Sequence, residues 1–254
     1  MLFKIYSLIY RKLYNITISK DSVFEGNIND LHSNCIKIVK KAEVRIGNNV
    51  KIKNCKIEVV AGKLIIEDNV TIKDYNISVG KNCTLVIGDN CIFEKKDNWR
   101  NPYIILWDNS ILNIGHHNRL RCDFMCRFGG HCNIGKYNCI NERTELRCDE
   151  CIYIGSYNMI SYNCRIWDTN THSFYTDDTR RKMTEDMYPN IGAEKDKPKT
   201  LKVYIGNDNL IGENVAILKG TRINDNVKVG FSSVLSNKII DTGKTVVGPS
   251  CRTI

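Results

Sequence analysis

Residues 205–234 read IGNDNL-IGENVA-ILKGTR-INDNVK-VGFSSV, a run of five hexads without interruption. Each hexad opens on an aliphatic residue, at Ile205, Ile211, Ile217, Ile223 and Val229. A period of six fits neither an amphipathic helix nor a simple alternating strand. It predicts a solenoid in which each hexad supplies one short strand and one corner, with the aliphatic residue pointing inward.

The same signal continues upstream of this run. Ile-Gly pairs at Ile114, Ile134 and Ile154 recur every 20 residues, and further pairs begin at Ile46 and Ile87. Because a triangular coil needs about three hexads, a 20-residue period corresponds to one turn with a slightly longer corner. Stacked turns bury one continuous aliphatic stripe and so form one cooperative body. We therefore expect an all-β fold, a parallel β-helix that occupies residues 21–254 as a single domain.

Composition narrows the partners and the compartment. The chain of 254 residues carries a formal net charge of +9, which favours an anionic partner such as a nucleotide-bearing cofactor, an acidic glycan or an anionic membrane. The basic residues are scattered without an aromatic stacking pattern, which argues against nucleic acid. Among the 12 cysteines, the spacing of Cys122, Cys126 and Cys132 matches no common zinc pattern, so we expect free thiols and no metal. No secretory signal is evident, and reduced thiols predict the cytoplasm.

Residues 1–20 form the other predicted segment, an N-terminal helix or cap. Within residues 1–16, Phe3, Tyr6 and Leu13 share one face of an amphipathic helix. The segment is too short and too charged to span a bilayer. Two compatible interpretations stay open, a peripheral contact with the inner face of an anionic membrane and a lid on the first coil of the solenoid.

The repeat stops at His172 and resumes near Leu201. The intervening loop, residues 173–201, is charged and too long for an ordinary connection, and loops of that length in compact domains are usually functional or disordered.

The stretch that leads into this loop, Trp167 to His172, reads W-D-T-N-T-H. On an extended strand Asp168, Asn170 and His172 project from the same side. A hydroxyl that attacks a thioester needs a nearby base, and neutral imidazole suits that role. Asp168 or Asn170 would then orient its second nitrogen. A lone histidine is often only an edge residue, but its place at the exit of the repeat favours a catalytic role for His172.

Three stretches resemble the hexapeptide-repeat acyltransferases, a family with a left-handed parallel β-helix. They are the D-x-N-x-H-S motif of residues 168–173, the hexads of residues 205–234 and the tail from Gly248 to Arg252. Within the family, the chain is most similar to the sugar O-acetyltransferases that act on galactosides, maltose, capsule or O-antigen. The resemblance implies a homotrimer that uses acetyl-CoA as co-substrate, needs no metal and acts on a carbohydrate acceptor.

The resemblance also implies roles for individual residues. His172 matches the general base. Asn141 and Trp167 are candidates for contact with the acceptor. Lys238 and Arg252 match basic residues that meet the nucleotide phosphates. The positions that match the lining of the pantetheine arm are Gly212, Lys219, Gly230, Ser232 and Ser233.

The chain departs from the family pattern in three places. Leu210 stands where the family usually has Trp, and Phe231 stands where it often has a small residue. The usual G-N-P-A-K ending is replaced by G-P-S-C-R.

Other functions remain open on the sequence. An N-acetyltransferase of an amino nucleotide sugar would share fold and donor. A non-enzymatic β-helical scaffold or membrane adaptor would need neither the polar stretch before His172 nor the long loop after it. A γ-type carbonic anhydrase would need three zinc-binding histidines, and the five histidines of the chain offer no pair at a suitable spacing. No residue identifies the sugar or the hydroxyl.

Overall fold

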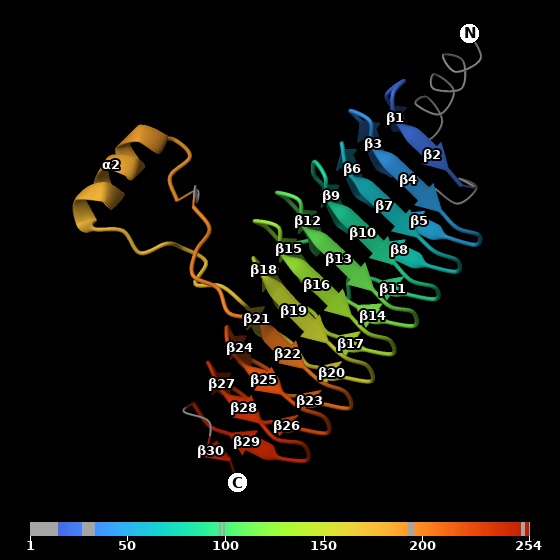
Figure 1. The fold of residues 1–254 in the computed structure, drawn as a ribbon. Helices are drawn as coiled ribbons and strands as arrows, with labels where there is room; N and C mark the ends of the chain where they lie inside the picture. The colour runs from blue at the N-terminus through green and yellow to red at the C-terminus, as the bar shows by residue number, and fades with distance from the viewer. Residues whose placement is uncertain are drawn as a thin grey trace.

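The computed structural model describes residues 15–26, 34–96, 98, 100–192 and 196–249, together with the backbone of residues 252–253. Within these residues the chain winds into a β-helix built from three sheets of ten strands each (Figure 1). All strand pairs are parallel except that of β29 with β30. The predicted parallel β-helix is therefore confirmed.

We name the sheets A, B and C in the order in which each coil visits them. Sheet A contains β1 (Ile16–Ile18), β3 (Cys35–Val39), β6 (Lys56–Val60), β9 (Asn76–Val79), β12 (Tyr103–Leu106), β15 (Asp123–Cys126), β18 (Glu145–Cys148), β21 (Arg165–Trp167), β24 (Ala216–Leu218) and β27 (Val234–Leu235). Sheet B contains β2 (Val23–Glu25), β4 (Glu43–Ile46), β7 (Lys63–Ile66), β10 (Thr84–Ile87), β13 (Ile111–Ile114), β16 (His131–Ile134), β19 (Cys151–Ile154), β22 (Val203–Ile205), β25 (Arg222–Ile223) and β28 (Ile239–Ile240). Sheet C contains β5 (Lys51–Lys53), β8 (Thr71–Lys73), β11 (Ile92–Phe93), β14 (Arg119–Leu120), β17 (Cys139–Ile140), β20 (Met159–Ile160), β23 (Leu210–Ile211), β26 (Lys228–Val229), β29 (Thr245–Val247) and β30 (Arg252–Thr253). The corners that join the sheets stack into three edges, which we name AB, BC and CA.

The core is the aliphatic stripe that the sequence predicts. Ile134, Ile154 and Ile205 pair in register along sheet B and are all buried. Along most strands, buried residues alternate with more exposed ones, because successive side chains point to opposite faces. Burial of each isoleucine side chain contributes about 1.5–3 kcal/mol to the free energy of folding. The stack of many such residues therefore stabilises strands that are individually too short to be stable.

The corners explain the recurring glycines and asparagines. Asn69 and Asn90 adopt left-handed backbone angles, with φ of 59° and 57°, a region that asparagine tolerates better than most residues. A Cβ atom on Gly135 would lie 2.4 Å from the carbonyl oxygen of Gly155 in the next coil. Glycine at such a position is therefore a requirement of coil stacking.

A ladder of buried asparagines runs along the BC edge. The side chain of Asn138 donates to Asn118 Oδ1 at 3.1 Å and to the carbonyl of Gly155 at 2.9 Å. Its own Oδ1 accepts from the backbone and side-chain nitrogens of Asn158 at 2.9 and 3.0 Å. Asn209 continues the pattern by donating its backbone N–H to Asn158 Oδ1 at 2.9 Å. The ladder fixes the spacing between coils without exposing a polar group to water.

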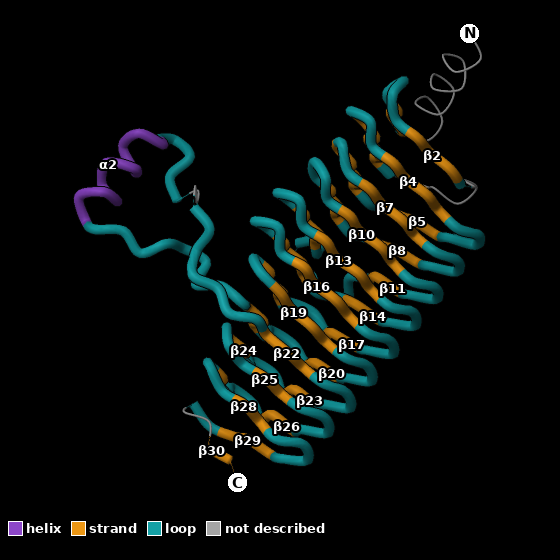
Figure 2. The backbone as a smooth tube through the Cα atoms, viewed as in Figure 1, coloured by secondary structure: helices purple, strands orange, loops and turns teal. Residues whose placement is uncertain are grey.

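An arm interrupts the coils between β21 and β22. It leaves and rejoins through an antiparallel bridge between Thr169 and Thr200 and contains the helix α2 (Asp177–Met187), capped by Thr176. The helix buries no residue, and the arm projects away from the β-helix (Figures 1 and 2). The sequence predicts the loop but not the helix within it.

A longer CA corner separates β11, which ends at Phe93, from β12, which begins at Tyr103. The predicted helix of residues 1–16 and the side chain of Arg252 lie outside the described residues. In the part of the chain that the structure describes, no helix is both long enough and apolar enough to cross a membrane.

Candidate functional site

His172 lies at the AB edge, where the arm leaves the coils. Strand β21 ends at Trp167, and Thr171 has a left-handed φ of 67°. The strand alternation expected for Asp168, Asn170 and His172 is therefore wrong, because the extended backbone is interrupted before it reaches His172. Asp168 is buried, Asn170 is half-buried and His172 is exposed.

Asp168 fixes the root of the arm. Its carboxylate accepts hydrogen bonds from the backbone N–H groups of Asp149, Glu150 and Cys151, at 2.8, 2.8 and 2.7 Å. Burial raises the pKa of Asp168, and these three N–H donors partly oppose the rise. Its carbonyl oxygen accepts from the backbone N–H of Leu201 at 2.9 Å, where the chain returns from the arm. Asp168 thus ties both legs of the arm to the coil.

The arm encloses a cavity of about 470 Å³ that His172 lines. Phe174 and Tyr175 line it from the outgoing leg, and Met183 and Met187 line it from α2. Phe174 is 84% exposed, so the arm has no closed apolar core of its own. A cavity of ~300–1,000 Å³ with apolar walls and few polar groups is typical of small-molecule sites.

Trp167 lies on the outer face of sheet A, between the AB and CA edges. The guanidinium of Arg147 lies 4.8 Å from the centre of its ring. Trp167 Nε1 and Arg147 Nε are both buried and have no hydrogen-bond partner among the described residues. Arg147 donates through Nη2 to Glu145 Oε1 at 3.0 Å, which links this stack to the CA edge.

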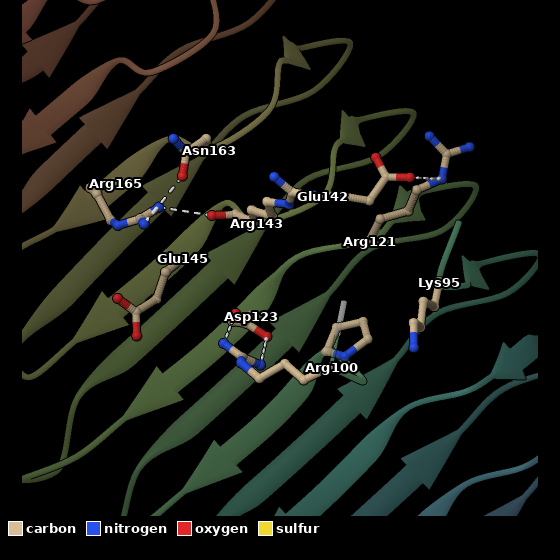
Figure 3. Close-up of a pocket in the computed structure, with 10 residues that line it drawn as sticks. Lys95, Arg100, Arg121, Asp123, Glu142, Arg143, Glu145, Asn163 and Arg165 are labelled. Atoms are coloured by element: carbon tan, nitrogen blue, oxygen red, sulfur yellow. Dashed lines mark hydrogen bonds and ion pairs between the residues drawn. The ribbon is translucent and has the colours of Figure 1, made fainter. Parts of the chain in front are cut away.

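Asn141 lies at the CA edge and accepts a hydrogen bond from Arg121 Nη1 at 2.9 Å. It neighbours a second cavity, of about 170 Å³, that the sequence did not reveal (Figure 3). The lining residues are mostly charged: Lys95, Arg100, Pro102, Arg121, Asp123, Glu142, Arg143, Glu145, Asn163 and Arg165. The one sequence signal was that polar residues open three successive strands of sheet A, where Asp123, Glu145 and Arg165 pair in register.

The candidate cofactor residues fall into two groups. Lys219 and Lys238 lie in successive AB corners, where the Asn237 N–H donates to the Lys219 carbonyl at 3.1 Å. Ser232 is exposed at the CA edge. Ser233 is 0% exposed and occupies an inward position of the CA corner, so a place in the pantetheine lining would depend on its backbone rather than its side chain.

Gly212 and Gly230 also lie at the CA edge, and coil stacking accounts for both. A Cβ atom on Gly212 would lie 2.9 Å from the backbone nitrogen of Phe231, and one on Gly230 would lie 2.7 Å from Val247 Cγ1. The side chains of Leu210 and Phe231, the two departures from the family pattern, are exposed. Neither substitution therefore affects the packing of the core.

The candidate residues thus divide between two edges of one protomer, with sheet A between them. His172, Lys219 and Lys238 lie at the AB edge, whereas Asn141 and the glycine corners lie at the CA edge. Among the described residues, no group of three or more His, Cys, Asp or Glu side chains is placed to hold a metal ion.

Comparison with known proteins identifies a family repeat in the C-terminal coils. Residues 202–237 match the family model described as bacterial transferase hexapeptide (six repeats). This part of the chain therefore carries the six-residue repeat that the family model describes. No curated protein sequence matches it significantly.

Two solved structures share the hexapeptide-repeat fold over most of the chain. The polySia-specific acetyltransferase NeuO aligns with a TM-score of 0.55 and 15% identity, covering 93% of this chain and 87% of its own. The UDP-N-acetylglucosamine acyltransferase of Arabidopsis aligns with a TM-score of 0.53 and 14% identity, covering 93% of this chain and 73% of its own. At these identities the comparison shows a common fold.

Proposed function

We propose that this protein is an acetyl-CoA-dependent O-acetyltransferase that acylates a hydroxyl of a sugar or surface polysaccharide. The observation that carries the proposal is the position of His172, exposed at the root of the arm and lining its 470 Å³ cavity. The fold adds support, because two proteins named as acyl- or acetyltransferases share it over 93% of this chain.

In the proposed reaction His172 acts as the general base. Its imidazole takes the proton of the acceptor hydroxyl while that oxygen attacks the thioester carbonyl carbon of acetyl-CoA. The tetrahedral intermediate collapses, the carbon–sulfur bond breaks, and the imidazolium returns the proton to the departing thiolate. No covalent enzyme intermediate is needed. Asp168 acts as a positioning residue, because it fixes the backbone from which Asn170 and His172 project.

A homotrimer would bring the two groups of candidate residues together. The AB edge of one protomer would face the CA edge of its neighbour, so that one acetyl-CoA contacts both. Lys219, Lys238 and Arg252 would bind phosphates, while the CA corners at Gly212, Gly230 and Ser232 would line the pantetheine arm. Such an enzyme would act in the cytoplasm, where acetyl-CoA is made, with residues 1–16 available for peripheral contact with the inner membrane.

The test is thiol release from acetyl-CoA by purified protein in the presence of sugars, nucleotide sugars and acidic or neutral oligosaccharides. His172→Ala should lower acceptor-dependent release by about 10²-fold or more, since a positioned general base contributes roughly 10²–10⁴-fold. His131→Ala is the matched control, because His131 is also exposed but lies on β16 in sheet B. Equal activity of the two variants would refute the assignment of His172.

The same assay separates the alternatives. An O-acetyl product is an ester and is cleaved by mild base, whereas the N-acetyl product of an amino nucleotide sugar is an amide and survives. Absence of both thiol release and acetyl-CoA binding would favour the non-enzymatic scaffold.

A further inference from the structure

The 170 Å³ cavity at the CA edge contains a buried acceptor without a donor. Glu142 is only 6% exposed, and its Oε2 has no hydrogen-bond partner among the described residues. Its other oxygen, Oε1, lies 3.6 Å from Arg121 Nε. A buried carboxylate oxygen without a donor is unfavourable, and a ligand that donates a hydrogen bond removes that penalty.

Arg121 is already committed to other partners. Its Nε and Nη2 donate to Glu94 Oε1 at 2.9 and 2.8 Å, and its Nη1 donates to Asn141. Glu94 is in turn held by Arg119 Nη2 at 2.6 Å. The N–H groups of Arg121 are therefore used by Glu94 and Asn141. Glu142 Oε2 is available to accept a hydrogen bond from a ligand.

On the far side of the same cavity, Arg165 offers an uncompensated positive charge (Figure 3). Its Nη1 donates to the carbonyls of Arg143 and Cys164 at 2.8 and 2.9 Å, and its Nη2 donates to Asn163 Oδ1 at 3.3 Å. These acceptors are all neutral. Within the described residues, Arg165 forms no ion pair with a carboxylate.

The remaining buried carboxylates of the cavity are satisfied. Asp123 pairs with both terminal nitrogens of Arg100, at 3.1 and 2.6 Å, and also accepts the Tyr103 N–H at 3.0 Å. Glu145 accepts from the hydroxyl of Tyr103 at 2.9 Å and from Arg147. Five basic side chains face three acidic ones in the lining, so the cavity as a whole favours an anion.

We infer that this cavity binds a carboxylate-bearing sugar unit of the acceptor. A hydroxyl of the unit donates to Glu142 Oε2, and its carboxylate meets Arg165. A volume of 170 Å³ is below the ~300–1,000 Å³ of pockets that enclose drug-sized ligands, so it holds one ring while the rest of a chain continues over the surface. The inference rests on the proposed function and gives the acceptor its class, an acidic polysaccharide.

The experiment measures binding by titration calorimetry on the His172→Ala protein, in which chemistry is disabled and the CA edge is unchanged. The probes are a galacturonic acid hexamer and the neutral hexamer maltohexaose. We expect the acidic hexamer to bind and the neutral one to bind at least ~10-fold more weakly, the size of one charge-assisted hydrogen bond. Arg165→Gln and Glu142→Gln, each added to this background, should also weaken binding of the acidic hexamer ~10-fold or more.

Arg222→Gln is the matched control for charge, because Arg222 is an exposed strand residue on sheet B that stacks on Tyr204. Melting temperatures of all variants report on folding. Equal weakening by Arg165→Gln and Arg222→Gln would overturn the inference, since it would show only general electrostatic attraction. Absence of binding, or binding unaffected by Glu142→Gln, would also overturn it. Thiol release by the wild-type protein is measured separately, so failure of the acidic-sugar site is distinguishable from failure of the acetyltransferase proposal.

Discussion

The BC and CA edges of the β-helix both bury polar side chains, but they treat them differently. On the BC edge, Asn118, Asn138 and Asn158 bond to one another and to backbone carbonyls. On the CA edge, Glu142 is also buried, yet one of its oxygens has no partner among the described residues and lies beside a cavity. A buried polar group that the chain satisfies stabilises the fold, whereas one that the chain leaves unsatisfied next to a cavity indicates a ligand.

The end of the asparagine ladder shows where this distinction applies. Asn209 Oδ1 accepts the backbone N–H of Val227 at 2.7 Å, but no side-chain amide follows at that position of the next coil, and Asn209 Nδ2 has no partner among the described residues. Asn209 lines none of the cavities described above. The unsatisfied Nδ2 of Asn209 therefore only destabilises the end of the ladder, and we do not interpret it as part of a ligand-binding site.

The largest expected effect comes from breaking the ladder at its middle. Asn138→Ala removes a side chain that takes part in four hydrogen bonds, and it deprives the buried Asn158 N–H of its acceptor and the Gly155 carbonyl of the Asn138 donor. We expect a loss of about 2–4 kcal/mol in the free energy of unfolding, measured by urea denaturation. Asn113→Ala is the control, because Asn113 makes its side-chain hydrogen bond on the exposed face of sheet B. Similar stability of the two variants would mean that the ladder does not hold the coils together.

At the AB edge, we expect a change at Asp168 to lower the free energy of unfolding by a smaller amount that depends on pH. Asp168→Asn keeps the shape of the side chain but replaces one carboxylate oxygen by an amide NH₂, so at least one of the three N–H groups loses its acceptor and we expect a loss of about 1–3 kcal/mol. Because burial raises the pKa of Asp168, the folded wild type takes up a proton at higher pH than the unfolded chain does. Proton uptake then favours the folded state. The stability contributed by Asp168 should increase as the pH falls through its folded pKa and level off below the ordinary value of 3.8.

Asparagine does not titrate, so the difference in unfolding free energy between wild type and Asp168→Asn isolates this group. Urea denaturation at fixed protein concentration across the acid range should show that difference widening as the pH falls. A difference that narrows instead would mean that the N–H bonds outweigh burial and hold the pKa of Asp168 below its ordinary value.

The smallest effect on stability is expected at Glu142. Glu142→Gln removes a charge that the chain only partly satisfies, so the free energy of unfolding should change by less than about 1 kcal/mol or increase. Calorimetric melting of the ligand-free protein measures this change. A loss of unfolding free energy as large as that expected for Asn138→Ala would show that Glu142, like the asparagines of the BC edge, stabilises the fold.

Much of the fold could be predicted from the sequence because the hexad period is local. Openers such as Ile211 and Ile217 are buried where the period places them. The period is less informative within the corners, where it does not distinguish the buried Ser233 from the exposed Ser232 beside it. Helix α2 was missed because it buries no residue and so has no apolar period to detect.

The site was less predictable, for two physical reasons. His172 would lie on the same side as Asp168 and Asn170 only if the backbone stayed extended, and the left-handed angle at Thr171 interrupts it. The CA cavity is assembled from different coils: Arg121, Glu142 and Arg165 lie about one coil apart and come together only through the stacking register. No short motif records such a cluster, although the polar residues at the starts of successive sheet A strands were a visible signal.

The way in which the arm is attached has a consequence for how such chains diversify. The two legs meet in the bridge between Thr169 and Thr200, and Ile152 in the preceding coil pairs directly with Val203 beyond the arm. The register of the coils on either side is thus set by pairs that do not involve the arm. We therefore expect changes in the length or sequence of the arm to alter the surroundings of His172 while the β-helix keeps its register.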